Sequence, residues 1–215
     1  MCDKEFRLIL LHEDSDFVVV EKPGGLLSVP GRGPMNQDCV VGRIRKMFPA
    51  CIEQPSVHRL DMFTSGLMVL ALTREAHRHL SRQFQERLVD KRYIALLDGI
   101  VDRELGEVTL SFRLDPENRP YQIYDPVQGK TGITIWKKID VQEGRTRVEF
   151  TPLTGRTHQL RLHAAHALGL SCPIIGDRLY GCGHEGDMML LHASSLSFLH
   201  PSTGKRISFS SPAPF

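Results

Sequence analysis

The longest apolar run in this chain, residues 67–72, holds only six residues, and its length constrains the fold more than any other feature. A helix that crosses a bilayer needs about 20 apolar residues, so no segment is expected to span a membrane. A short continuous run is instead typical of a strand that is buried on both faces. The sequence therefore predicts a globular protein built around such a strand, which suits its 41% hydrophobic and 24% charged residues.

Strand and helix patterns alternate along the 215 residues without internal repeats. One helix is expected to begin at an Asn36 cap, a second to run from a Thr73 cap to about Leu88, and a third to cover residues 158–168, ended by Gly169. Strands are expected at residues 6–11, 17–21, 67–72, 93–97, 107–112, 132–141, 145–151, 190–198 and 207–209. This pattern predicts an α+β fold with a mixed, largely antiparallel sheet, flanked by a few helices on one side.

The chain as a whole is expected to be one cytoplasmic domain. No composition break divides residues 1–215, which predicts a single domain. The apolar residues 8–11 are followed by an acidic stretch, which does not fit a signal peptide. Five cysteines without a C-x-x-C pair favour a reducing compartment over a disulfide framework.

Positive charge is concentrated in one part of the sequence. The whole chain carries a formal charge of only +2, but residues 43–92 hold 10 basic and 5 acidic side chains, or +5. Arg74, Arg78 and Arg82 recur there at four-residue spacing, on a different face of the expected helix from its apolar residues. The asymmetry suggests a surface that meets phosphate, although a merely solvated helix face explains the charges equally well.

The densest polar cluster runs from His58 to Gly66, just before the buried strand. Asp61 stands there between Arg59 and a Thr-Ser-Gly turn. The guanidinium would favour the ionised carboxylate, the turn could orient it as a nucleophile, and Gly66 would permit close approach of a substrate. An aspartate that caps the turn and pairs with Arg59 as scaffold is the alternative interpretation of this spacing.

His58-Arg59-Leu60-Asp61, followed by Thr64-Ser65-Gly66-Leu67, is similar to the H-R-L-D-x-x-T-S-G-L signature of one family, the RluA-type pseudouridine synthases. Four further segments resemble family motifs in the expected order, and they begin at Glu21, Lys91, Leu153 and Pro173, with Leu190-Leu191-His192-Ala193 after them. The matches extend from about residue 17 to residue 212. The chain is therefore identified as a short member of the family, in which residues 1–215 form a single catalytic domain.

The resemblance implies isomerisation of uridine in RNA without a cofactor. Asp61 matches the catalytic aspartate, Arg156 would pair with its carboxylate, and Tyr93 would pack on the uracil and take part in proton loss from C5. Leu191 would line the pocket beneath the base, and Arg59 would fill the space that the flipped uridine leaves. His58, Thr64 and Ser65 complete the expected substrate-binding set.

The expected partner is a structured RNA stem-loop, from ribosomal RNA, transfer RNA or both. The sequence begins almost directly with the catalytic motifs, which suggests that this domain recognises RNA by itself, largely through shape. A monomer is the default expectation. An RNA-binding or ribosome-assembly protein whose isomerase activity is secondary is the alternative function.

Metal sites and other enzyme classes are weaker hypotheses. His158, His163 and His166 lack the four-residue separation of a two-histidine helical zinc site, and Cys172, Cys182 and His184 are loosely spaced. Asp14 and Asp16 precede their strand, contrary to the order in phosphatases, and the carboxylates nearest to Asp61 in sequence, Glu53 and Glu75, lie in no glycosidase motif. No glycine-rich phosphate loop is present. Neither a metal nor a nucleotide cofactor is therefore expected.

Overall fold

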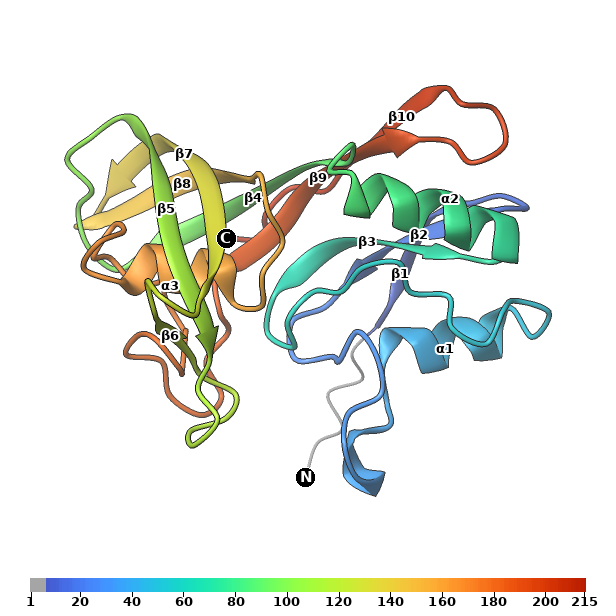
Figure 1. The fold of residues 1–215 in the computed structure, drawn as a ribbon, viewed down its shortest axis with the longest axis horizontal. Coiled ribbons are helices and arrows are strands. Elements are labelled where there is room, and N and C mark those ends of the chain that lie inside the picture. Colours follow the sequence, from blue (N-terminus) through green and yellow to red (C-terminus); the bar gives the residue numbers. More distant parts are fainter. Residues whose placement is uncertain (1–6) are drawn as a thin grey trace. The chain divides into compact units, whose positions relative to one another are not determined.

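The computed structural model describes residues 7–215, which form two compact units (Figure 1). Unit 1 contains the described residues up to Lys91 together with His192–Pro214, and unit 2 contains Arg92–Leu191 with Phe215. The chain therefore leaves unit 1, builds unit 2 and returns. The single domain expected from the sequence stays a prediction, because two compact units can belong to one domain that unfolds as a whole.

Unit 1 is a sheet with a helix on each face. Its elements are β1 (Ile9–Glu13), β2 (Phe17–Lys22), η1 (Pro34–Asn36), α1 (Val40–Met47), β3 (Ser65–Ala71), α2 (Arg74–Gln85), β9 (Leu191–Leu199), whose first residue belongs to unit 2, and β10 (Arg206–Ser210). Strand β2 pairs antiparallel with β1 and with β3, β3 pairs parallel with β9, and β10 pairs antiparallel with β9. The mixed, largely antiparallel sheet expected from the sequence is thus confirmed.

The apolar run of β3 is buried on both faces, as its composition predicts. Leu67, Val69 and Ala71 pack with residues of α2, while Met68 and Leu70 pack with residues of α1. The period of two along a strand sends alternate side chains to opposite faces, so an unbroken apolar run needs a cover on both. The expectation of helices on one side of the sheet was therefore wrong for unit 1, as Figure 1 also shows.

Helix boundaries follow local hydrogen bonding. Thr73 accepts the Ala76 N–H and caps α2 as predicted, but the helix ends at Gln85, because Arg87 takes a left-handed φ of 61°. Helix α1 begins three residues later than expected, after Cys39, whose sulfur accepts the Gly42 N–H. Asn36 is not a cap, because it closes its own loop through a side-chain donation to the Arg32 carbonyl.

Unit 2 is an antiparallel sheet with one short helix. Its elements are β4 (Asp90–Leu97), which starts in unit 1, β5 (Leu105–Leu114), β6 (Gln122–Tyr124), β7 (Lys130–Gln142), β8 (Arg145–Pro152) and α3 (Gln159–Ala165). The strand order is β4-β8-β7-β5-β6. Helix α3 ends earlier than expected, since the backbone is already extended at His166. Gly169 instead allows a close approach, because a Cβ there would lie 2.1 Å from the His163 carbonyl oxygen.

A histidine side chain in α3 is buried, and we expect it to make unit 2 sensitive to acid. The His163 side chain is fully buried, packs edge-on against Phe112, and has no hydrogen-bond partner for either ring nitrogen among the described residues. Burial, with a contribution from His166, lowers its pKa from 6.5 to about 4. The unfolded chain therefore binds more protons between these pH values, so stability is full near pH 7 and falls as the pH drops toward 4.

We expect His163→Leu to remove part of this acid sensitivity. Between pH 7 and pH 5 the wild type should lose about 2 kcal/mol of unfolding free energy through His163, and the variant should not lose that share. Urea unfolding of both proteins at the two pH values measures the difference. An equal loss in both would mean that His163 takes up its proton without cost in the folded state.

Candidate active site

Asp61 lies in a tight turn that leads into β3. The Thr64 N–H donates to the Asp61 carbonyl oxygen at 3.1 Å, and Thr64 itself is buried. The Asp61 side chain is half-buried, while Arg59 is exposed on the same loop. The Asp61 carboxylate therefore lies close to the surface, while the main chain of the turn is held by the hydrogen bond from buried Thr64.

The Lys22 side chain, at the end of β2, is buried beneath this turn. The side chain is 0% exposed, and its Nζ donates to the carbonyl oxygens of Pro23, Leu26 and Met62 at 3.0, 2.8 and 2.9 Å. Three acceptors match the three N–H donors of an ammonium group. Burial lowers the pKa of Lys22 to about 7, and the negative charge of nearby Asp61 opposes that shift. Lys22 therefore ties the loop after β2 to the residue that follows Asp61.

A serine fixes the other side of the aspartate. The Ser28 hydroxyl donates to the Leu60 carbonyl oxygen at 2.7 Å and accepts the Leu60 N–H at 3.0 Å. The Gly25 N–H adds a bond to the Met62 carbonyl oxygen at 2.9 Å. The main chain is therefore anchored at both residues next to Asp61, which limits how far the carboxylate can move.

His58 joins the Asp61 loop to the sheet and to α2. Its Nε2 accepts the Val69 N–H at 3.0 Å, and its ring stacks on Phe84 with centroids 4.5 Å apart. Burial, with the charge of Lys91, lowers the pKa of His58 to about 3, so the ring is neutral at physiological pH. Contact with these two elements positions the loop, and the substrate-binding role expected for His58 stays a prediction.

Ser65 and Gly66 connect the start of β3 to β9. The Ser65 hydroxyl is 2.9 Å from Nδ1 of His192, whose Nε2 is 3.0 Å from the Ser211 hydroxyl. Burial lowers the pKa of His192. Gly66 has a φ of +106°, and a Cβ there would lie 2.4 Å from the Ala193 carbonyl oxygen. The close approach at Gly66 is therefore made by β9, so a substrate is not needed to explain this glycine.

Arg156 lies in unit 2, on the exposed loop between β8 and α3. Its backbone N–H donates to Oε1 of Gln159 at 3.0 Å, and its Nε donates to the Thr131 carbonyl oxygen at 3.4 Å. Gln159 is buried, and its Nε2 donates to the Ile133 carbonyl oxygen at 3.0 Å. One glutamine side chain thus fastens the Arg156 loop to β7.

A buried ion pair joins Arg161 of α3 to Asp177, after the helix in sequence. Arg161 donates through Nε and through one terminal nitrogen to the two carboxylate oxygens of Asp177 at 2.7 and 2.6 Å. The Tyr180 hydroxyl is 2.9 Å from Nδ1 of His158 and accepts the Gln122 N–H. The motifs around Arg156 and Asp177 are therefore one hydrogen-bonded scaffold.

The predicted site residues are divided between the two units. Asp61, Arg59, His58, Thr64 and Ser65 lie together in unit 1, in the turn and at the start of β3. In unit 2, Tyr93 lies on β4 opposite Phe150 of β8, and Leu191 is a buried residue at the start of β9. The pairing of Arg156 with Asp61 stays a prediction.

Residues 16–166 match the family described as RNA pseudouridylate synthase. The chain belongs to this family. A dual-specificity RNA pseudouridine synthase RluA of Pasteurella multocida is 43% identical over 212 residues, which covers 97% of this chain and 94% of the relative. The protein of the same name from Escherichia coli K12 is 42% identical with the same coverage. The solved structure of human RNA pseudouridylate synthase domain containing 1 aligns with a TM-score of 0.78 and 28% identity, over 100% of this chain and 87% of that one. Pseudouridine synthases are isomerases, and so is this chain.

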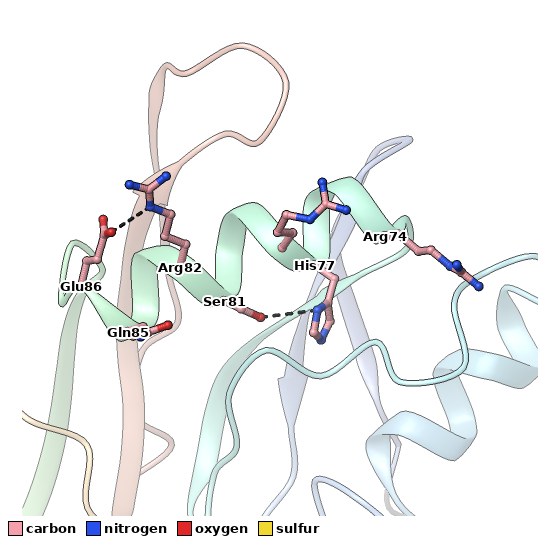
Figure 2. A pocket seen from close by; sticks show the side chains of 7 residues that line it. Arg74, His77, Ser81, Arg82, Gln85 and Glu86 are labelled. Carbon is pink, nitrogen blue, oxygen red and sulfur yellow. Dashed lines mark hydrogen bonds and ion pairs between the residues drawn. The ribbon is translucent and has the colours of Figure 1, made fainter.

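Helix α2 of this pseudouridine synthase carries an open groove on its outer side (Figure 2). The groove has a volume of about 630 Å³ and is lined by Arg74, His77, Arg78, Ser81, Arg82, Gln85 and Glu86. Arg82 pairs with Glu86 at 2.8 Å and is highly exposed. The sequence prediction that Arg74, Arg78 and Arg82 share one exposed face of the helix is thus confirmed. Exposure alone does not show that they contact RNA.

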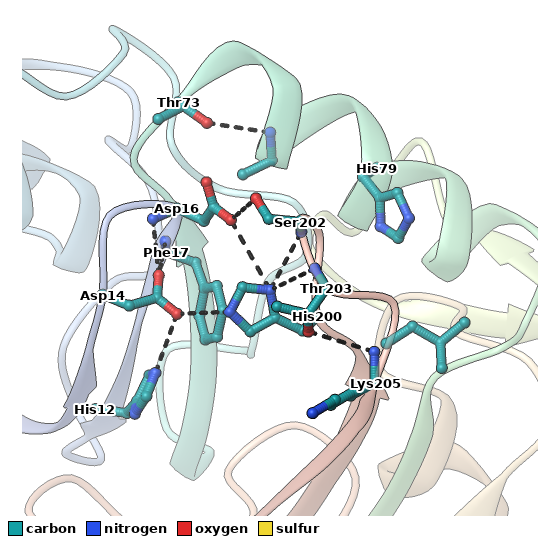
Figure 3. Close-up of polar contacts among 12 residues, drawn as sticks. His12, Asp14, Asp16, Phe17, Thr73, His79, His200, Ser202, Thr203 and Lys205 are labelled. Atoms are coloured by element: carbon teal, nitrogen blue, oxygen red, sulfur yellow. Dashed lines mark hydrogen bonds and ion pairs between the residues drawn. The ribbon is translucent and has the colours of Figure 1, made fainter.

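Metal-ligand side chains come together at one place in the described part of this synthase. Ligand atoms of Asp14, Asp16 and His200 lie within 4.8 Å of one another (Figure 3). Asp14 accepts the backbone N–H groups of Asp16 and Phe17 and is 3.0 Å from Nε2 of His200. These bonds tie the β1–β2 turn to the β9–β10 hairpin, so the cluster is explained as a turn anchor. Neither set of histidines and cysteines considered from the sequence forms such a group among residues 7–215.

None of the described helices has the length and apolar character needed to cross a membrane.

Proposed function

We propose that this pseudouridine synthase isomerises uridines in stem-loops of more than one RNA, in ribosomal and transfer RNA. The word "dual-specificity" in the names of relatives that are 42–43% identical over 97% of the chain supports more than one substrate. Positive charge is concentrated in residues 43–92, which surround Asp61, and the part of it on the exposed face of α2 supports recognition through phosphates.

In the proposed mechanism Asp61 acts on the uridine after the base has left its stack. The N1–C1′ bond breaks, the uracil turns and C5 bonds to C1′. The hydrogen on C5 then leaves as a proton, and N1 takes up a proton, so that the product is an isomer of the substrate. Tyr93 would contact the uracil and assist the proton loss, Leu191 would lie beneath the base, and Arg156 would orient the carboxylate. Exposed Arg59 would fill the space that the base leaves, while Thr64 and Ser65 complete the set on the Asp61 turn.

The anchored main chain on both sides of Asp61 carries this proposal. Lys22 and Gly25 hold the Met62 carbonyl oxygen, and Ser28 holds both main-chain polar groups of Leu60. A catalytic carboxylate must meet its target atom with a small positional error, and neighbours that are fixed before substrate arrives reduce the entropy cost. The rigid turn is therefore suited to hold a reacting group.

We expect a monomer that needs neither metal nor nucleotide, because the chemistry uses only a carboxylate and a proton acceptor. A cytoplasmic location fits the RNA substrates and the free thiols of Cys39, Cys51, Cys172 and Cys182.

Release of tritium from C5 tests the proposed function directly, since isomerisation must replace that hydrogen. Purified protein is incubated with a transfer RNA anticodon stem-loop and with ribosomal RNA hairpins, each made with 5-tritiated uridine. We expect stoichiometric release from at least one RNA of each class, with chelator present and no nucleotide added. Release from neither class would refute the proposed substrates, and release from one alone would refute the dual specificity.

A further inference from the structure

We infer that the groove on α2 is a docking surface for the phosphate backbone of the substrate RNA, separate from the pocket for the uracil. This inference rests on the proposed function, because it takes an RNA strand as the partner. It concerns only residues of unit 1.

The charges of the groove favour an anionic strand. Three arginines against the single carboxylate of Glu86 leave two net positive charges on the lining. Glu86 pairs with Arg82, whereas Arg74 and Arg78 have no ion pair with any of residues 7–215. Two guanidinium groups are therefore exposed and not neutralised within the protein, which is the arrangement that phosphate contacts require.

The geometry of the groove fits a strand rather than a single ion. Residues four apart on an α-helix lie on one face and are separated by about 6 Å along the axis. The row formed by Arg74, Arg78 and Arg82 thus extends over two such steps along α2. Each step is comparable with the distance between successive phosphates of a strand. Ser81 and Gln85 add neutral hydrogen-bonding groups in a neighbouring row, and Figure 2 shows them pointing to the other side of α2 from Arg82.

One edge of the groove adjoins the loop that carries Asp61. His77, Ser81 and Phe84 follow the spacing i, i+4, i+7, so they share one side of α2. Phe84 stacks on His58, three residues before Asp61. A strand that lies along α2 therefore passes beside the Asp61 loop, so the groove can hold the RNA that flanks the target uridine.

The double variant Arg74→Gln, Arg78→Gln tests the groove. Both side chains are exposed, so the change should leave the fold intact. We expect RNA affinity to fall about tenfold at low salt, and the slope of log K against log salt to shrink by about 1.5, or 0.7–0.9 for each lost contact. The single-turnover rate at saturating enzyme should stay within twofold of wild type.

Two further variants make the result specific. Arg45→Gln, Lys46→Gln removes the same charge from exposed positions of α1, on the other face of the unit 1 sheet, and should change affinity less than twofold. Glu86→Gln releases Arg82 from its ion pair and should strengthen binding about threefold, an effect that a folding defect cannot produce.

The inference would be overturned if the Arg74→Gln, Arg78→Gln variant kept the RNA affinity and salt slope of the wild type. It would also be overturned if the α1 control lost as much RNA affinity as that variant. Affinity titrations do not depend on turnover, so the two proposals can fail separately. Wild-type protein that binds RNA through the groove but releases no tritium would refute the proposed function and leave the docking surface standing.

Discussion

Asp61→Asn should lower the rate of pseudouridine formation by at least about a thousandfold while RNA affinity stays within a few-fold of wild type. The substitution is nearly isosteric, but the amide can neither attack the ribose nor accept a proton as a carboxylate does. The side chains of Lys22 and Ser28 anchor main-chain atoms of Met62 and Leu60 and not the Asp61 carboxylate, so the turn should keep its shape. Phosphate contacts should dominate affinity, and they are unchanged.

Glu53→Gln is the matched control for this experiment. Glu53 is an exposed carboxylate in the same segment before β3, and its loss should leave the rate within twofold of wild type. Single-turnover tritium release with excess enzyme measures all three proteins. Turnover by Asp61→Asn above the level of contaminating activity would remove Asp61 from the catalytic role. Full rescue of a deletion strain by Asp61→Asn would show that binding, and not isomerisation, is the main role in the cell.

Residue periodicity was sufficient to predict most of unit 1. The apolar run in β3 and the Thr73 cap of α2 are local signals, and both are confirmed. Helix α1 was misplaced at its start because Asn36 offers a good cap in isolation, whereas its side chain is used within the preceding loop. Strand β6 was missed because its three residues carry no periodic signal of their own. The first error arises because a local side-chain hydrogen bond competes with helix capping, and the second because β6 is defined by its pairing with β5.

The anchors of the Asp61 turn could not be derived from spacing. Lys22 is in a motif that resembles the family, but lysine is rarely buried, and its three acceptors come from two separate segments. Ser28 is 32 residues from Leu60 in sequence. One usable signal was present, since Lys22 ends a strand whose first four residues are apolar and lies on the same face as Val18 and Val20. A polar side chain at such a position must find partners, which marks it as a candidate anchor.

The roles expected for Tyr93, Arg156 and Leu191 come from motif order alone, and they remain predictions. What unit 2 adds is the way Arg156 is supported, through Gln159 and the scaffold beneath α3. Because the Arg161–Asp177 ion pair of that scaffold is almost fully buried, we expect a large loss of stability when one partner is removed.

Loss of Asp177 should destabilise the protein by about 3–5 kcal/mol, because the Arg161 guanidinium would be left buried without its counter-ion. The two side chains are 4% and 0% exposed. Burial acts to raise the pKa of Asp177, but Arg161 and the N–H groups of Leu179 and Tyr180 outweigh it and hold the pKa below its usual value. The carboxylate is therefore charged in the folded protein, and Asp177→Asn removes that charge with little change in volume.

A double-mutant cycle separates the ion pair from the rest of the scaffold. Arg161→Met leaves a buried carboxylate and should also cost several kcal/mol, whereas the double variant with Asp177→Asn buries no lone charge. We expect the double variant to be at least about 2 kcal/mol more stable than the sum of the single losses predicts. The same cycle on Arg206 and Asp90, which are 46% and 76% exposed, should give a coupling below about 1 kcal/mol. Urea unfolding measures all the variants, and additive losses at Arg161 and Asp177 would mean that the packing beneath the Arg156 loop, and not charge pairing, holds α3 in place.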